Sequence, residues 1–291
     1  MTEISERAYA KLNLSLDVTG RREDGYHEMI MLMQTVSLSD RIQIRKTEGG
    51  PIRASSNLGF IPTDERNLAV RAALRYLEAV GEKAEGLHID IRKEIPVGAG
   101  MAGGSADAAA VLRGMNRMYG NQMGRRELER LAEQVGSDVA FCVAGGTALA
   151  TGRGEILQDQ PALPDCVFVL VKPGFSISTP ELFKKLDQSP ARIHPDTAGL
   201  LEALASSDLK AMSRRMYNVF EDVDDRRMRT VTEIRSKLLD HRALGAIMTG
   251  TGSAVFGVFE EKSTAEVACT ALKQEYKFCC TARPVARLLE E

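Results

Sequence analysis

A glycine-rich segment near residue 100 has the composition of a phosphate-binding loop. Four glycines fall within seven residues: Gly98, Gly100, Gly103 and Gly104. Glycine costs about 0.5–1 kcal/mol relative to alanine in regular structure, so such a run indicates a backbone that must curl around or closely approach a ligand. An alanine-rich helical segment, 105–118, follows directly, and Ser105 is expected to cap it. A glycine loop that leads into a helix presents free amides and the positive end of a dipole, which together bind anions.

Two known phosphate-binding patterns fit this segment only in part. The P-loop pattern needs a lysine, whereas this segment ends in Gly-Gly-Ser. The dinucleotide pattern G-x-G-x-x-G matches at Gly98, Gly100 and Gly103, but it needs a buried parallel strand before the loop and another strand after the helix. Residues 87–92 alternate as in an antiparallel sheet, and a second helical pattern, 125–135, follows. A nicotinamide-dependent oxidoreductase therefore stays only as a remote alternative.

Polar residues elsewhere have side chains suited to proton transfer. Residues 8–18 alternate strictly between apolar and polar, which predicts a strand with one buried face. Lys11 and Asn13 lie two residues apart on its polar face, hence on the same side. Asp138 follows a Gly-Ser turn, where its carboxylate could take a proton from a hydroxyl or cap a helical turn at 139–143. The residues alone favour a solvated lysine and a capping aspartate.

The remaining pattern predicts an α+β protein of two domains, 1–160 and 161–291, divided near the segment QDQPALPD. The hydrophobic periodicity predicts further strands at 29–46, after Gly146, and at 166–171, 244–249, 254–259 and 279–286. It predicts further helices at 67–80, 180–187, 197–205, 208–217, 226–240 and 263–275.

Bulk composition excludes several classes of function. The net charge is −2 and no long basic run occurs, so nucleic acid is not an expected partner. No apolar stretch of 18 residues occurs, so no membrane partner or span is expected. Five cysteines without a C-x-x-C pair predict free thiols in a reducing cytoplasm, and the N-terminal residues lack an apolar signal core. Four scattered histidines give no metal cluster.

Three spaced motifs together resemble the GHMP small-molecule kinases: AYAKLNLSLDV, IPVGAGMAGGSADAAAVL and MTGTGSAVFGVF. The resemblance covers nearly the whole chain. The stretches KLNLSLDVTGRREDGYHEM, GSDVAF and PGFSISTPELF are similar to the branch of the family that acts on 4-diphosphocytidyl-2-C-methyl-D-erythritol. This resemblance implies ATP, Mg²⁺ and transfer of the γ-phosphate to the 2-hydroxyl of that compound, a step of non-mevalonate (MEP) isoprenoid precursor synthesis. It also implies a ribosomal-S5-domain-2-like N-terminal domain with a left-handed βαβ unit and a ferredoxin-like C-terminal domain.

The resemblance also implies roles for individual residues. Asp138 is the catalytic base, Lys11 pairs with it and with the reacting hydroxyl, and Asn13 binds substrate hydroxyls or orients Asp138. His27 reads the cytosine edge while Tyr26 and Phe183 stack on the base, which contributes about 1–3 kcal/mol per ring. The residues implied for ATP binding are Asn67, Pro96, Val97, Gly98, Ala99, Gly100, Met101, Ala102, Gly103, Gly104, Ser105, Ala106, Gly250 and Gly252. Thr179 is implied on the ribose or diphosphate side of the substrate.

Alternatives remain for several of these residues. Ser105 caps a helix, touches phosphate or contacts Mg²⁺, Asn67 is by default a helix cap, and Phe183 is equally a core residue. The family commonly has a second serine where Ala106 stands and a proline where Ala140 stands, and neither departure removes a residue assigned to chemistry. A homoserine-type or mevalonate-type kinase would not need the aromatic residues, and a catalytically silent relative would not need Lys11 with Asp138. The Mg²⁺ ligands and the choice between monomer and homodimer stay open.

Overall fold

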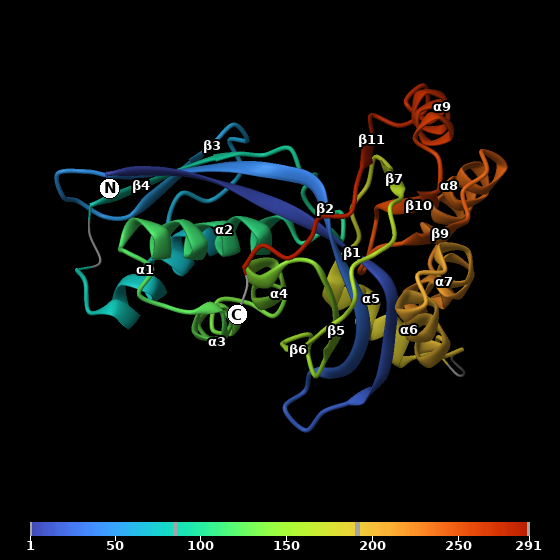
Figure 1. Ribbon diagram of the computed structural model, residues 1–291, viewed down its shortest axis with the longest axis horizontal. Helices are drawn as coiled ribbons and strands as arrows, with labels where there is room; N and C mark the ends of the chain where they lie inside the picture. Colours follow the sequence, from blue (N-terminus) through green and yellow to red (C-terminus); the bar gives the residue numbers. More distant parts are fainter. Residues whose placement is uncertain (1, 84–85, 190–192, 290–291) are drawn as a thin grey trace.

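The computed structural model describes residues 2–83, 86–189 and 193–289, which form two sheets set along the long axis of the molecule (Figure 1). Within these ranges the first sheet has seven strands, in the order β3-β4-β2-β1-β8, with β5 paired to β2 and β6 paired to β5. Their bounds are β1 (Glu3–Arg21), β2 (His27–Lys46), β3 (Arg53–Ser56), β4 (Leu87–Arg92), β5 (Thr147–Thr151), β6 (Ile156–Asp159) and β8 (Tyr217–Asn218). The short strands β3, β6 and β8 were not predicted by the periodicity.

The long hairpin β1–β2 differs from the predicted one-sided strand. β1 alternates between buried and accessible side chains only at its start, because every residue from Ala10 to Val18 is buried. The second half of β1 pairs with β8 and is covered from both sides. The alternation of apolar and polar residues therefore does not indicate which side chains are exposed there. A register shift between Asn13 and Ser15 changes the direction in which the side chains after it point. As a result, Lys11 and Leu16 line the same cleft.

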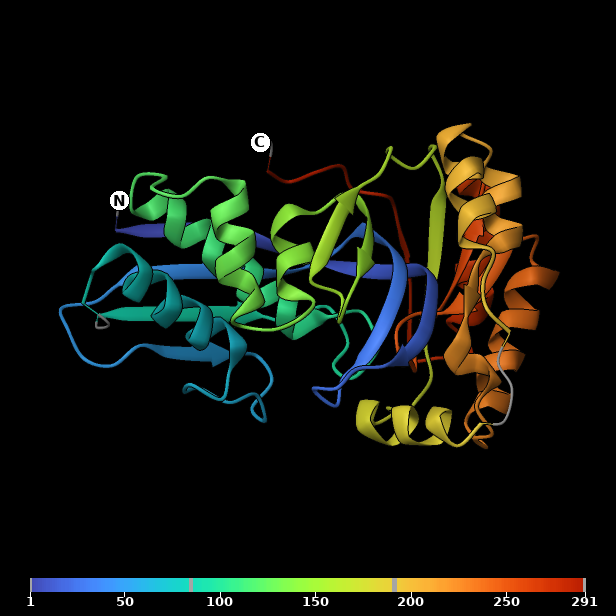
Figure 2. The same cartoon turned by 90° about the horizontal axis from the view of Figure 1, so that it is seen from below.

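Four helices cover one face of the first sheet (Figures 1 and 2): α1 (Leu68–Val80), α2 (Gly103–Met118), α3 (Arg125–Glu133) and α4 (Val139–Ala144). α2 is buried almost all round because it lies between the sheet and α1. Its small residues allow close approach, and a Cβ at Gly114 would lie 2.9 Å from Ile44 Cδ1. Asn67 caps α1 by accepting from Ala69 N, and Gly81 ends it at φ 72°, as predicted.

The second sheet is antiparallel, with the order β11-β7-β10-β9. Its strands are β7 (Val167–Lys172), β9 (Gly245–Met248), β10 (Val255–Phe259) and β11 (Phe278–Ala282). In chain order this is the 4-1-3-2 arrangement of a ferredoxin-like fold, which confirms that expectation. α8 (Met228–Asp240) and α9 (Lys262–Leu272) pack on it. The connection from β7 to β9 also contains α5 (Thr179–Asp187), α6 (Thr197–Ala205), α7 (Leu209–Arg215) and the short η1 (Val219–Asp222).

Two segments of the second half return to the first sheet. β8 lies parallel to β1 beside Ser15 and Leu16. The C-terminal segment also runs back along the first half, where Val285 N donates to Thr35 O at 2.9 Å and Leu288 N donates to Ala144 O at 2.8 Å. The α+β class is confirmed, while the domain boundary near residue 160 stays a prediction. No helix in the described ranges has the length and apolar composition of a membrane span.

Candidate active site

A cleft of about 520 Å³ opens where the two halves of the chain meet. It is lined by the glycine loop, the first turn of α2, the hairpin β1–β2, the segment before α1, the start of α5 and the turn between β9 and β10. This volume is within the range of small-molecule sites. The cleft therefore brings together the three motifs that the sequence spaces far apart.

The glycine loop approaches the β9–β10 turn more closely than any side chain would allow. Gly98 and Gly100 have φ of 64° and 75°, in the region that favours glycine. A Cβ at Gly100 would lie 2.1 Å from Thr249 O, and one at Gly250 would lie 2.8 Å from Gly100 O. Ala102 also has positive φ, at 56°, a conformation that non-glycine residues adopt mainly where the surrounding structure imposes it. The loop conformation is therefore set by the turn against it.

Hydrogen bonds tie the loop to both neighbouring motifs. Lys11 N donates to Met101 O at 3.3 Å, so β1 borders the loop directly. From the other side, Ala254 N donates to Ala99 O at 3.1 Å. The Thr249 hydroxyl joins all three motifs, because it accepts from Asn13 N at 3.1 Å and donates to Gly100 O at 3.3 Å. The loop, β1 and the turn therefore form one connected unit.

Lys11, Asn13 and Asp138 lie together at one end of this unit. Lys11 Nζ donates to Asn13 Oδ1 at 2.6 Å and lies 3.8 Å from Asp138 Oδ2. Asp138 occupies the cap position of α4, but its side chain makes no capping hydrogen bond. The local preference for a capping aspartate is therefore wrong, and its carboxylate is free to act in the cleft. A carboxylate beside a buried ammonium group suits acceptance of a proton from a hydroxyl.

The N-cap residue of α2 differs from the one predicted from the sequence. The helix begins at Gly103, and its cap residue is Ala102, which makes no side-chain capping bond. Ser105 lies inside the first turn, so its hydroxyl is not the N-cap predicted from the sequence. The first intrahelical bond runs from Ala106 N to Ala102 O at 2.8 Å. The amides of residues 103–105 therefore have no intrahelical acceptor, as at every helix N-terminus, and they face a cleft wide enough for phosphates.

A buried charge network under the loop was missed by sequence reasoning. Lys93 Nζ donates to Asp40 Oδ2 at 2.5 Å and to Asp107 Oδ2 at 2.7 Å. Asp40 Oδ1 also accepts from the backbone N of Ile95, at the entry to the loop. A Cβ at Gly103 would lie 3.2 Å from Lys93 Nζ, so the ammonium group lies directly against the start of α2. In the sequence, the only sign of this network is that charged residues occur within segments whose other residues form an apolar pattern.

Asp107 is the unusual member of the network. Its side chain is almost fully buried, and its Oδ1 has no hydrogen-bond partner within the described residues. Burial raises the pKa of the Asp107 carboxyl well above its usual range, and the nearby Lys93 ammonium offsets only part of that increase. Asp107 also lines the cleft, near the start of α2.

Asn67, Thr179 and Phe183 also line the cleft, whereas the predicted residues Ala106, Tyr26 and His27 are not among its lining residues. Asn67 lines the cleft while capping α1, so the default cap and the predicted pocket position coexist. Thr179 Oγ1 lies 2.8 Å from Thr251 Oγ1, across the mouth of the turn. The Phe183 ring carries the His27 ring stacked at 4.5 Å, and His27 Nε2 lies 2.8 Å from Asp187 Oδ1. Tyr26 is over half exposed on the hairpin, so the stacking of a base between Tyr26 and Phe183 stays a prediction.

Comparison with known proteins identifies the family. Residues 67–146 match the N-terminal domain of GHMP kinases and residues 200–277 match their C-terminal region. A protein of Clostridium botulinum (strain Loch Maree / Type A3) described as 4-diphosphocytidyl-2-C-methyl-D-erythritol kinase is 42% identical over 93% of this chain and 96% of its own length. A protein of Lachnospira eligens with the same description is 41% identical over 92% of this chain.

The chain belongs to the GHMP kinase family.

Solved structures agree with this GHMP kinase assignment. A crystal structure of 4-(cytidine 5'-diphospho)-2C-methyl-D-erythritol kinase superposes with a TM-score of 0.81 at 34% identity, covering 97% of this chain and 99% of that chain. A homoserine kinase from Cytophaga hutchinsonii shares the fold, with a TM-score of 0.78 at 21% identity over 99% of this chain. As a GHMP kinase, the protein is an ATP-dependent small-molecule kinase. The nicotinamide alternative is wrong, because β4 pairs antiparallel with β2 and α3, rather than a strand, follows α2.

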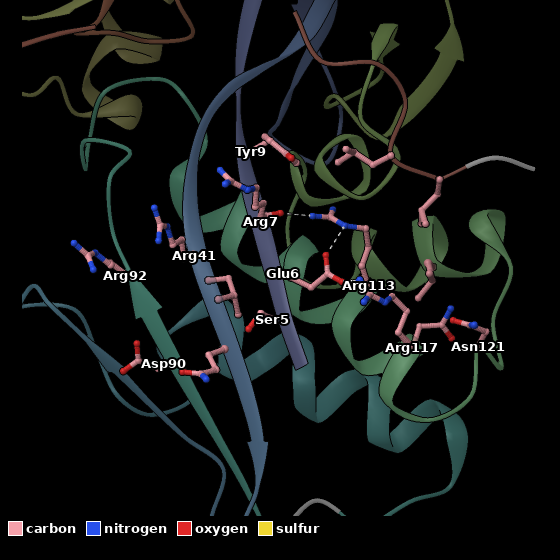
Figure 3. Close-up of a pocket in the computed structure, with 16 residues that line it drawn as sticks. Ser5, Glu6, Arg7, Tyr9, Arg41, Asp90, Arg92, Arg113, Arg117 and Asn121 are labelled. Carbon is pink, nitrogen blue, oxygen red and sulfur yellow. Dashed lines mark hydrogen bonds and ion pairs between the residues drawn. The ribbon is translucent and has the colours of Figure 1, made fainter. Parts of the chain in front are cut away.

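A larger cavity of the GHMP kinase, about 930 Å³, shares no lining residue with the cleft (Figure 3). It lies around the start of β1 and is rich in arginine. Arg7, Arg41 and Arg92 stand directly opposite one another on β1, β2 and β4. On the other side, Arg113 donates to the carbonyl of Arg7 at 2.7 Å. Size alone therefore does not mark the catalytic cleft, since all three family motifs line the cleft, whereas only Tyr9 of the first motif lines this cavity.

Proposed function

We propose that this kinase transfers the γ-phosphate of ATP to the 2-hydroxyl of 4-diphosphocytidyl-2-C-methyl-D-erythritol. The observation that carries the proposal is the joining of two groups at one cleft: the cluster of Lys11, Asn13 and Asp138, and the ring group of His27 on Phe183. Relatives described as kinases of this compound match nearly the whole chain. A cytoplasmic location and a monomeric or homodimeric state are part of the same proposal.

The proposed chemistry follows from the positions of these groups. The amides at the start of α2 and the glycine loop hold the triphosphate. Asp138 accepts the proton of the 2-hydroxyl as the hydroxyl oxygen forms its bond to the γ-phosphorus, and the bond from that phosphorus to the bridging oxygen of ADP breaks. Lys11 stabilises the negative charge that develops on the attacking oxygen.

Mg²⁺ would neutralise phosphate charge during this transfer. The described residues contain no group of three or more His, Cys, Asp or Glu side chains that could hold a metal ion. The described residues therefore fit a Mg²⁺ ion that arrives with the nucleotide, because such an ion usually keeps several waters and binds mainly through phosphates. On the protein side, the Ser105 hydroxyl in the first turn of α2 is our proposed ligand.

Release of ADP by the purified protein, with ATP and Mg²⁺, tests the proposal. The acceptors to compare are 4-diphosphocytidyl-2-C-methyl-D-erythritol, homoserine and mevalonate. We expect turnover with the cytidylyl compound and none above background with the other two. Turnover with homoserine or mevalonate instead would keep the kinase fold and reject the cytosine pocket.

A further inference from the structure

Arg153 is one of the cations that line the cleft within the described residues, and the proposed mechanism gives it no role. Among the described residues that line the cleft, Lys11, Lys93 and Arg66 are each bound to carboxylates. Lys11 is assigned to the reacting hydroxyl, and Lys93 supports the glycine loop. Arg66 is held by Asp64 in the segment before α1. Arg153 is the fourth cation, and it comes from the turn between β5 and β6.

The turn that carries Arg153 is fixed against β2. Gly152 and Gly154 flank the arginine with φ of 70° and 109°, so both positions favour glycine. Met29 N donates to Gly152 O at 2.8 Å, and a Cβ at Gly154 would lie 2.9 Å from Met31 Cε. Met29 and Met31 themselves line the cleft. The backbone of Arg153 is therefore held at the cleft wall by contacts that do not involve its side chain.

The guanidinium group of Arg153 packs on an aromatic ring. Its Cζ lies 5.0 Å from the centre of the Tyr26 ring. Its Nε lies 3.5 Å from Glu155 Oε1, and neither terminal nitrogen has a hydrogen-bond partner in the part of the chain that the structure describes. A guanidinium group that packs through its face keeps the N–H donors at its edge available. Arg153 therefore presents a planar pair of donors with no assigned acceptor.

We propose that Arg153 binds the diphosphate group of the cytidine diphosphate portion of the substrate. The inference rests on the proposed function, because only that substrate class carries a diphosphate between its base and its reacting alcohol. Arg153 contacts Tyr26 at the base end and lines the same cleft as Asp138 at the reacting end. The paired donors of a guanidinium group match phosphate oxygens in geometry and in charge. Arg153 thus selects against small alcohols that lack this group.

Binding of cytidine diphosphate (CDP) and of cytidine separates this role from simple support of Tyr26. We would measure both affinities by calorimetry, with ADP saturating the nucleotide end, for wild type, Arg153→Gln and Arg153→Lys. Wild type should bind CDP about tenfold or more tightly than cytidine, the ratio expected for hydrogen bonds to a charged group. Arg153→Gln should remove most of that ratio and leave the cytidine affinity within about twofold, while Arg153→Lys should keep part of it.

Steady-state kinetics give a second readout. Arg153→Gln should raise the KM for the cytidylyl substrate by about tenfold, with kcat and the KM for ATP nearly unchanged. Arg75→Gln removes an arginine charge on the outer face of α1 and serves as the matched control. Thermal unfolding of each variant establishes that it is folded, and Arg153→Lys carries the test if the glutamine variant is not.

Two results would overturn the inference. An equal loss of CDP and cytidine affinity in Arg153→Gln would mean that Arg153 only supports Tyr26. A wild-type protein that binds CDP no more tightly than cytidine would exclude a diphosphate contact altogether. Turnover of the cytidylyl substrate in that second case would leave the proposed function standing, so the two failures are distinguishable.

Discussion

The ammonium group of Lys11 lies 3.8 Å from the carboxylate of Asp138, yet the two side chains differ in their access to solvent. The side chain of Lys11 is only 5% exposed, whereas that of Asp138 is 33% exposed. The lysine is therefore fixed by the fold, while the carboxylate keeps one side open to the cleft. This asymmetry is what a base needs when it must meet a substrate hydroxyl beside a fixed positive charge.

Replacement of Asp138 by Asn should remove the base and keep the shape of the site. We expect kcat to fall by about 10²–10⁴-fold, the usual contribution of a positioned base, with the KM for ATP within about threefold of wild type. ADP release at saturating substrate measures the effect. Asp240→Asn, on the exposed end of α8, is the control and should leave kcat unchanged. Near-wild-type turnover of Asp138→Asn would reject its role.

Replacement of Gly100 by Ala should disrupt the joint between the glycine loop and the β9–β10 turn. The new Cβ would lie 2.1 Å from Thr249 O, and φ is 75°. We expect the free energy of unfolding to fall by about 2 kcal/mol or more, together with loss of ATP binding. Urea unfolding and ATP calorimetry test both. Gly174→Ala has no atom within 4 Å of its new Cβ and should be nearly neutral in both measurements.

The network under the loop predicts unequal effects for its members. Lys93→Met leaves Asp40 and Asp107 buried without their cation, which should cost about 3–5 kcal/mol of the free energy of unfolding. Asp107→Asn leaves one lysine with one carboxylate and should cost much less. Denaturant unfolding of the two variants at neutral pH compares them directly. Equal destabilisation would mean that the charge balance of the network is unimportant.

Asp159 predicts how stability changes in acid. Paired hydrogen bonds from Arg125, at 2.7 and 3.0 Å, lower the pKa of Asp159 from 3.8 to about 2, and Arg287 adds to the effect. Its stabilising contribution is therefore complete above pH 3.8 and is lost as the pH falls toward about 2.

Asp159→Asn should be less stable than wild type at pH 6, and the difference should shrink as the pH falls toward about 2. Denaturant unfolding across this pH range measures it. Asp165→Asn is the control, because that side chain is 90% exposed and its ion pair is long, at 3.9 Å. A difference between Asp159→Asn and wild type that stays constant with pH would contradict the prediction.

The arginine row in Figure 3 predicts that the outer face of the sheet can be stabilised. Arg7, Arg41 and Arg92 are like charges directly opposite one another on neighbouring strands, an arrangement that is unfavourable. Arg92→Glu should raise the free energy of unfolding by about 0.2–1 kcal/mol at low salt, and Arg92→Gln by less. Unfolding at low and high salt tests this, because screening should reduce the gain. A loss of stability at low salt would show that the row is favourable as it stands.

Much of the fold could be predicted because its determinants are local. Helix α1 has its cap at Asn67 and its stop at Gly81, and both act through the backbone of their own helix. The strands of the second sheet are short apolar runs bounded by turns, so the sequence predicted them. The short β3, β6 and β8 were not predicted, because strands of two to four residues carry too little periodic signal.

For the candidate site, the sequence by itself determined the glycine loop, the helix behind it and the shared side of Lys11 and Asn13, because backbone freedom and strand period depend only on neighbouring residues. Tertiary structure decided the rest. It buried both faces of β1, released Asp138 from capping, placed Lys93 between Asp40 and Asp107, and set Arg153 on Tyr26. Each of these features depends on which distant segments of the chain come into contact. Where such contacts bury a charged side chain, it must pair with an opposite charge, and no local sequence pattern encodes that pairing.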